Sequence, residues 1–168
     1  GLEGCVSMEG RKTQSEVADL MRACDGFIFP SIRELGAGVV IEAMACGMHC
    51  FVADYGAPGA LAADGRGDAV PIAQIEGMVE GFVERLEACA LNPTHMAETA
   101  ARGQAYAKSG FTWAQKGVHA EGLYRAVLAG DDLHALRCYQ AIGLAGIPAR
   151  VVLLGASLVS TALAPMVT

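Results

Sequence analysis

Two short apolar runs, at residues 27–29 and 50–53, enclose a helix-like stretch, and this arrangement constrains the fold more than any other feature of the sequence. Pro30 ends the first run, and Gly47 can adopt the left-handed conformation that often ends a helix. Strand-like and helix-like segments that alternate in this way are typical of a parallel sheet covered by helices. We therefore predict a Rossmann-like α/β fold in which residues 38–46 form the helix between two parallel strands.

The rest of the chain continues the same alternation up to about residue 72 and then becomes helical. Thr13 and Glu16 have the spacing of a capping box that opens a helix over residues 14–24. Glycine and proline predict a loop at residues 55–59 and a turn at residues 64–67, and a brief strand is expected at residues 69–72. Further helices are predicted at residues 75–91, 94–108 and 112–128.

Composition excludes some classes of function. The chain has 168 residues, 53% of them hydrophobic, which is enough for one ordinary domain with a buried core. Its net charge is −6, and Arg11 and Lys12 form the only basic pair, so we expect no nucleic-acid partner.

The six cysteines and four histidines show no C-x-x-C pair and no metal-ligand spacing. We therefore expect no metal, and we expect His49, His95 and His134 to be ordinary core or surface residues. Cysteines scattered among apolar residues are typical of a reducing compartment. The chain begins with Gly1 and has no basic leader, so we expect it to be cytoplasmic, with the inner face of the membrane as the alternative.

Two glutamates, Glu34 and Glu42, flank a small-residue loop that precedes the helix over residues 38–46. The first N–H groups of a helix have no acceptor within the helix and can bind an anion such as a diphosphate. Carboxylates beside a phosphate would repel it, so sugar hydroxyls, which are neutral donors, are better partners for them. The segment therefore predicts a site for a nucleotide sugar.

The last segment, residues 142–167, is apolar and long enough to span a membrane. Pro148, Arg150, Gly155 and Pro165 interrupt it, and a central arginine is costly in hydrocarbon. We therefore expect residues 131–168 to begin a further α/β unit, with a buried strand at residues 150–154. A membrane anchor is the alternative for this tail. In either case, residues 1–130 would form a nucleotide-sugar-binding domain.

Four segments together resemble a known family. The run PSIRELGAGVVIEAMACG, the following VADYGAPG, the GRGDAVPI stretch and Phe111-Thr112-Trp113 are similar to the C-terminal, donor-binding domain of family 4 retaining glycosyltransferases. The resemblance covers residues 6–128 and implies the C-terminal half of a GT-B fold, truncated at its N-terminus.

The resemblance also implies a role for each residue of the loop. Glu34 matches the catalytic-site glutamate that contacts hydroxyls of the donor sugar, and Glu42 matches the glutamate that binds the ribose hydroxyls. The loop whose backbone amides hold the diphosphate is matched by Gly36, Ala37, Gly38 and Val39.

The reaction implied is sugar transfer with retention, without a metal or a protein nucleophile. Its partners would be a nucleotide sugar and a glycan or lipid-linked acceptor, in polysaccharide, lipopolysaccharide or glycolipid assembly. Peripheral membrane association and the oligomeric state are left open.

The chain departs from the family pattern at two positions, where His49 replaces a usual proline and Ala60 replaces a common glutamate. The basic residues for the diphosphate, the catalytic histidine and the acceptor domain would lie upstream of Gly1, so we expect the isolated chain to be inactive. A non-catalytic nucleotide-sugar-binding domain and a membrane-anchored interaction module are the alternative functions.

Overall fold

The structure is a computed structural model that describes residues 3–34 and 36–131. The chain forms two compact units, Gly1–Ala107 and Lys108–Thr168. The predicted strand at residues 150–154 and the rest of the apolar tail lie outside the described residues. Among the described residues, no helix is long and apolar enough to cross a membrane.

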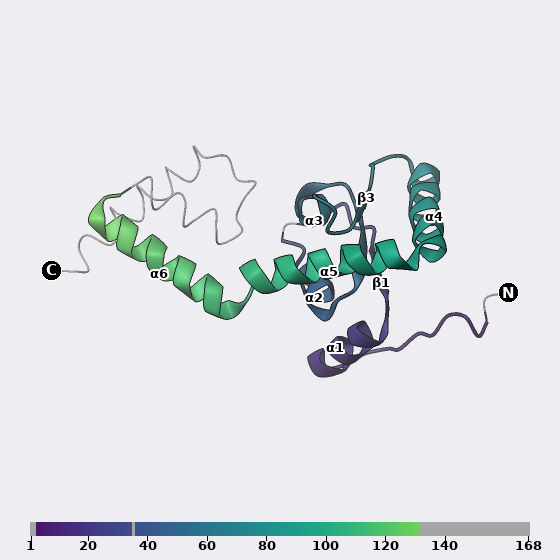
Figure 1. The fold of residues 1–168 in the computed structure, drawn as a ribbon, viewed down its shortest axis with the longest axis horizontal. Helices are drawn as coiled ribbons and strands as arrows, with labels where there is room; N and C mark the ends of the chain where they lie inside the picture. The colour runs from purple at the N-terminus through teal and green to yellow at the C-terminus, as the bar shows by residue number, and fades with distance from the viewer. Residues whose placement is uncertain (1–2, 35, 132–168) are drawn as a thin grey trace. The chain divides into compact units, whose positions relative to one another are not determined.

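The first unit is built on a parallel sheet in the order β1-β2-β3. Figure 1 shows this unit with helices around the strands. Its strands are β1 (Gly26–Phe29), β2 (His49–Ala53) and β3 (Asp68–Val70). In register, Phe27 pairs with Cys50, and Phe51 pairs with Asp68. The central strand β2 is buried along its whole length, as expected for a parallel strand covered on both faces. The predicted Rossmann-like α/β fold is thus confirmed.

Different helices cover the two faces of the sheet. On one face lies α2 (Gly38–Cys46), where the Cys50 thiol donates to the Val40 carbonyl across 3.9 Å. On the other face, Phe51 and Val70 pack with Phe82 of α4 (Ile75–Leu91) in the hydrophobic core. This burial of apolar surface on both sides is the main force that holds the layers together.

Helix α5 (Pro93–Gly110) passes the amino-terminal ends of the strands. A Cβ atom at Gly26, the first residue of β1, would lie 3.3 Å from the Met96 side chain. The Gln104 side chain donates to the Ala45 carbonyl at 3.1 Å, near the end of α2. The amino-terminal edge of the sheet is therefore closed by a helix.

Residues 55–59, predicted as a loop, instead belong to the helix α3 (Gly56–Ala62), so this prediction was wrong. Tyr55 is extended and serves as the N-cap residue. Pro58 falls in the first turn, where its missing N–H would have had no acceptor in the helix, and it is buried together with Gly59 and Leu61. Burial on the sheet thus stabilises a helix that the local sequence does not favour.

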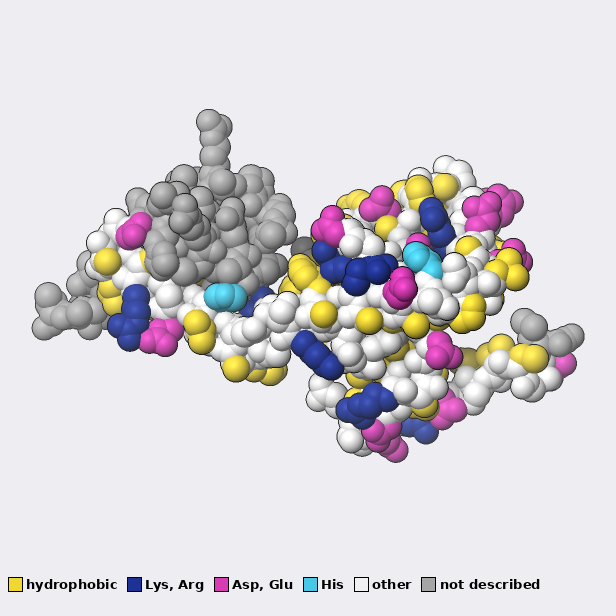
Figure 2. Space-filling view, viewed as in Figure 1, with side chains coloured by type: hydrophobic (Ala, Val, Ile, Leu, Met, Phe, Trp, Pro, Cys, Tyr) yellow, Lys and Arg dark blue, Asp and Glu magenta, His cyan; other side chains and the backbone are white. Residues whose placement is uncertain are grey.

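The remaining helices follow the predictions closely. The helix α1 (Gln14–Ala23) begins with the predicted capping box between Thr13 and Glu16. In the second unit, Thr112 caps α6 (Trp113–Ala129) by accepting from the Gln115 N–H at 3.3 Å. Figure 2 shows one face of the chain, on which basic side chains form small groups among acidic and apolar ones.

Candidate functional site

The predicted site lies where the chain leaves the carboxyl ends of β1 and β2. Glu34 follows β1 and is half-buried, and Gly56 follows β2 at the start of α3. A Cβ atom at Gly56 would lie 3.7 Å from the Glu34 carbonyl oxygen, so the two connections touch. Loops at this edge of an open parallel sheet form the usual ligand crevice of such folds.

Ala37 has an unusual backbone conformation at the start of α2. It is the N-cap residue, is almost fully buried, and has φ 47° and ψ 42°, in the left-handed region. An L-residue adopts this conformation at a cost of about 1–2 kcal/mol. Its N–H donates to Glu34 Oε1 at 3.3 Å, which holds the carboxylate over the loop. Strain of this kind concentrates at functional sites.

The first turn of α2 carries no side-chain cap and no acidic residue. The N–H groups of Val40 and Ile41 reach back to the Ala37 carbonyl, at 2.9 and 3.4 Å. The N–H groups of Gly38 and Val39 precede these bonds and have no acceptor within the helix. A helix start of this kind attracts an anion through its N–H groups and its dipole.

Gly36 and Gly38 leave open space beside this helix start. Neither has a positive φ, and a Cβ atom at either position would have no heavy atom of the described residues within 4 Å, its chain neighbours aside. Within the described chain, therefore, neither backbone conformation nor packing requires glycine here. A bound molecule that approaches the backbone closely would require it.

The structure places all six predicted residues on one segment, the loop after β1 and the first two turns of α2. Val39 is half-buried and Glu42 is exposed. Within the described residues, no hydrogen bond or ion pair holds the Glu42 side chain. The ligand contacts assigned to these residues stay predictions.

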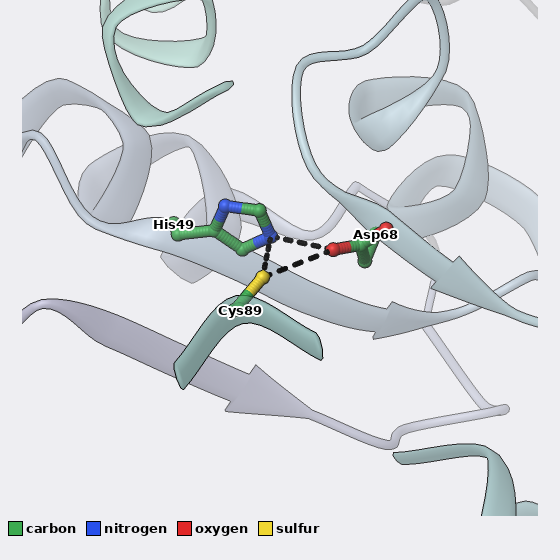
Figure 3. A group of neighbouring side chains, drawn as sticks. All are labelled: His49, Asp68 and Cys89. Carbon is green, nitrogen blue, oxygen red and sulfur yellow. Dashed lines mark hydrogen bonds and ion pairs between the residues drawn. The ribbon is translucent and has the colours of Figure 1, made fainter. Parts of the chain in front are cut away.

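A second group of polar residues lies at the opposite edge of the sheet, and sequence reasoning did not predict it. His49 Nε2 lies 2.9 Å from Asp68 Oδ2, and the Cys89 thiol lies 3.9 Å from the first atom and 3.6 Å from the second (Figure 3). His49 and Asp68 begin neighbouring strands, and Cys89 comes from α4. The His49 side chain is fully buried.

Burial and hydrogen bonding shift the ionisation of this group and of the strand beside it. The hydrogen bond with His49 holds the pKa of the Asp68 carboxyl below its usual value. Burial raises the pKa of the Cys89 thiol, and the neighbouring Asp68 charge adds to that effect. On β2, burial raises the pKa of the Cys50 thiol to about 12.

A parallel α/β sheet with a small-residue helix start at its carboxyl edge is the architecture of a Rossmann-like protein. Residues 1–105 match the family model for glycosyl transferases group 1, and the chain belongs to this family. The matched region contains both the loop after β1 and the group at the amino-terminal edge.

One curated relative is the D-inositol 3-phosphate glycosyltransferase of Rhodococcus erythropolis (strain PR4 / NBRC 100887). The two sequences are 31% identical over 114 residues, which is 67% of this chain. The chain spans about a quarter of the relative's length, because the matched region is 25% of that protein.

Proposed function

We propose that this chain is the donor-binding part of a retaining glycosyltransferase, equivalent to the C-terminal domain of a family 4 enzyme with the GT-B fold. Its membership of the group 1 glycosyl transferases supports sugar transfer in general. The donor is a nucleotide sugar, and the acceptor is a glycan or a lipid-linked sugar in polysaccharide, lipopolysaccharide or glycolipid assembly.

One observation carries the assignment of the site: α2 begins without a side-chain cap, between two glycines whose side-chain space is open. The diphosphate binds there, to the N–H groups of Gly38 and Val39. Gly36 and Ala37 line the same loop. Glu34 then accepts hydrogen bonds from hydroxyls of the donor sugar, and Glu42 accepts them from the ribose.

In this proposal the chain contributes positioning and charge stabilisation to the reaction. The bond between the sugar and the diphosphate breaks while the acceptor oxygen bonds to the same face of the sugar. The acceptor hydroxyl gives its proton to the leaving diphosphate, so no protein nucleophile and no metal is needed. The start of α2 stabilises the negative charge that develops on the diphosphate by about 0.3–2 kcal/mol.

A binding titration of the full-length protein tests this proposal, with UDP-, GDP- and ADP-sugars as ligands. Glu42→Ala should weaken binding of the preferred donor by roughly ten- to a hundredfold, since a hydrogen bond to a charged group is worth about 1.5–3 kcal/mol. Glu84→Ala, which removes an exposed glutamate of α4, is the matched control and should leave binding unchanged. Absence of nucleotide-sugar binding, or equal affinity in the two variants, would refute the proposed site.

A non-catalytic nucleotide-sugar-binding domain is the second candidate, and Ala60 favours it. This residue stands where the family commonly has a glutamate, and it is exposed on α3 with only a methyl group to offer a ligand. Incubation of the full-length protein with its preferred donor and with glycan, glycolipid and inositol phosphate acceptors separates the two functions. Donor binding without sugar transfer to any acceptor would favour the second candidate.

The proposed location of the full-length protein is the cytoplasm, with peripheral contact at the inner face of the membrane where the acceptor is lipid-linked. Cell fractionation with an epitope tag tests this proposal. A protein released from membranes by high salt would fit peripheral contact, whereas one released only by detergent would favour an anchor.

A further inference from the structure

The group of His49, Asp68 and Cys89 lies away from the proposed donor site. His49 and Asp68 are the first residues of β2 and β3, whereas the donor site follows the last residues of β1 and β2. β2 has five residues, so its two ends are about 13–17 Å apart. At that distance, the three side chains cannot contact a sugar bound at the proposed donor site.

Each ring nitrogen of His49 lies near one oxygen atom. His49 Nδ1 lies 3.4 Å from the Met96 carbonyl oxygen, which can only accept, so Nδ1 donates to it in the tautomer that carries the hydrogen there. In that tautomer Nε2 has a lone pair that can bind a metal ion, and it faces Asp68 Oδ2 at 2.9 Å. Two lone-pair atoms at that distance repel unless a proton or a metal ion lies between them.

The three ligand atoms also fit a tetrahedral metal site. Zinc binds nitrogen and oxygen at about 2.0–2.2 Å and thiolate sulfur at about 2.3 Å, which places tetrahedral ligands about 3.4–3.6 Å apart. The separations here are 2.9 Å between nitrogen and oxygen, 3.6 Å between sulfur and oxygen, and 3.9 Å between sulfur and nitrogen. Each is within about 0.5 Å of the ideal value, and all three side chains point toward one another (Figure 3).

The burial and the charges of this group are compatible with a divalent ion. His49 is fully buried and Cys89 is 3% exposed, so an unpaired charge here would be costly. A thiolate and a carboxylate carry two negative charges, which Zn²⁺ neutralises without residual charge. A backbone carbonyl beside Nδ1, as Met96 provides here, is one of the partners that orient a metal-binding histidine.

We propose that His49 Nε2, Asp68 Oδ2 and Cys89 Sγ bind one Zn²⁺ ion that links β2, β3 and α4. Binding releases the thiol proton of Cys89 to solvent, and zinc then bonds to the sulfur. The Asp68 side chain is 22% exposed, which leaves water access to the fourth ligand position. The ion is structural, because the donor site is at the other edge of the sheet. The proposed sugar transfer needs no metal, so zinc bound here should leave its rate unchanged.

Metal analysis of the purified 168-residue chain tests the proposal. The chain is stripped with a chelator, incubated with Zn²⁺ and separated from free metal, after which zinc per chain and the unfolding temperature are measured. We expect one zinc per chain and a higher unfolding temperature. Cys89→Ser and Asp68→Asn should each weaken zinc binding by roughly tenfold or more. Cys24→Ser and Asp19→Asn, which change exposed residues outside the group, should bind as the unchanged chain does.

Cobalt provides a second readout that does not depend on the stability of a variant. Co²⁺ bound to the unchanged chain should show the visible absorption of a tetrahedral site and a thiolate charge-transfer band, and the band should be absent in Cys89→Ser. Far-UV circular dichroism checks that each variant is folded. A folded, unchanged chain that binds no zinc, or that binds it equally after Cys89→Ser, would overturn the proposal.

Discussion

The two edges of the sheet in the first unit are built in different ways. At the carboxyl edge, the polar groups are backbone amides and two glutamates that lie within nine residues of one another, Glu34 to Glu42. Two glycines there border open space. At the amino edge, His49, Asp68 and Cys89 come from three elements, contact one another and lie under α5 and α4.

The carboxyl edge of the sheet is an open surface, whereas the amino edge is covered by helices. The loop after β1 keeps a strained N-cap residue, Ala37, and an uncapped helix start, both of which cost stability. The amino edge satisfies its polar atoms internally, or through an ion bound within the group. We therefore expect substitutions at the carboxyl edge to alter function and substitutions at the amino edge to alter stability.

The largest expected difference is between the alkylation rates of a buried thiol, Cys50, and an exposed one, Cys24. Burial raises the pKa of Cys50 to about 12, so at pH 8 it has about a thousandfold less thiolate than an ordinary cysteine. Cys24 is exposed. Alkylation of the native chain, followed by mass spectrometry of peptides, should label Cys24 rapidly and leave Cys50 unmodified until the chain unfolds. Equal labelling rates at Cys24 and Cys50 would show that the reagent reaches β2 in the folded chain.

The same thiol makes stability depend on alkaline pH. In the unfolded chain Cys50 loses its proton near its ordinary pKa, whereas the folded chain holds that proton up to about pH 12. The unfolded state is therefore favoured as pH rises above about 9, and stability is lost progressively up to about 12. Unfolding in urea at pH 8 and pH 10 should show a smaller loss for Cys50→Ala than for the unchanged chain. A loss as large in Cys50→Ala as in the unchanged chain would assign it to other groups.

Glu34→Gln should have the largest effect on sugar transfer. The glutamine oxygen can still accept from the Ala37 N–H, so the loop should fold as before. Without the charge, transfer by the full-length protein should fall by roughly 10²–10³-fold, as when a preorganised group in an active site is removed. Initial rates with the preferred donor measure this, and Glu84→Gln on α4 is the control. If both variants transfer sugar at the same rate, Glu34 has no part in the reaction.

Glycine substitutions compare the two edges directly. A Cβ atom at Gly67, beside Asp68, would lie 2.6 Å from the Cys50 carbonyl oxygen, which belongs to the backbone of β2. Gly67→Ala should therefore lower the free energy of unfolding by about 1–3 kcal/mol. Gly38→Ala, with nothing near its Cβ, should change it by less than about 0.5 kcal/mol. Urea unfolding of the two variants measures both values.

Nucleotide-sugar binding completes the glycine comparison. In the full-length protein, Gly38→Ala should weaken donor binding because its methyl group occupies space that the diphosphate needs. Gly67→Ala should leave donor binding unchanged under conditions where that variant is folded. Donor binding that Gly38→Ala leaves intact would mean that the open space beside α2 holds no ligand.

The two edges also differ in how far sequence could predict them. The loop from Glu34 to Glu42 is contiguous, so its motif, the helix start and the ending at Gly47 could be recognised without a fold. The contacts of His49 with Asp68 and Cys89 depend on strand register and on the rotation of α4, which no local spacing encodes. Ala37 in the left-handed region was not predicted either, because alanine has no intrinsic preference for it.

The helix α3 shows a second limit of prediction from sequence. Glycine and proline at residues 55–59 indicated a loop by their propensities, yet the segment forms a helix whose buried face packs on β2 and β3. Tertiary packing overrode a weak local preference. The capping box at Thr13 was predicted correctly because both of its hydrogen bonds are local.

The smallest expected effect compares two helix starts. Thr13 Oγ1 accepts from the Glu16 N–H at 3.3 Å, and Glu16 Oε2 accepts from the Thr13 N–H at 2.8 Å, so the start of α1 is satisfied by its own side chains. Thr13→Ala should lower the free energy of unfolding by about 1 kcal/mol, and Thr13→Gly by only a few tenths. Ala37 at the start of α2 makes no side-chain cap. Ala37→Gly should therefore leave stability unchanged or raise it slightly, since glycine adopts the left-handed conformation without strain. If Ala37→Gly instead cost as much as Thr13→Ala, the start of α2 would be held by packing that the fold itself requires, rather than kept open for a ligand.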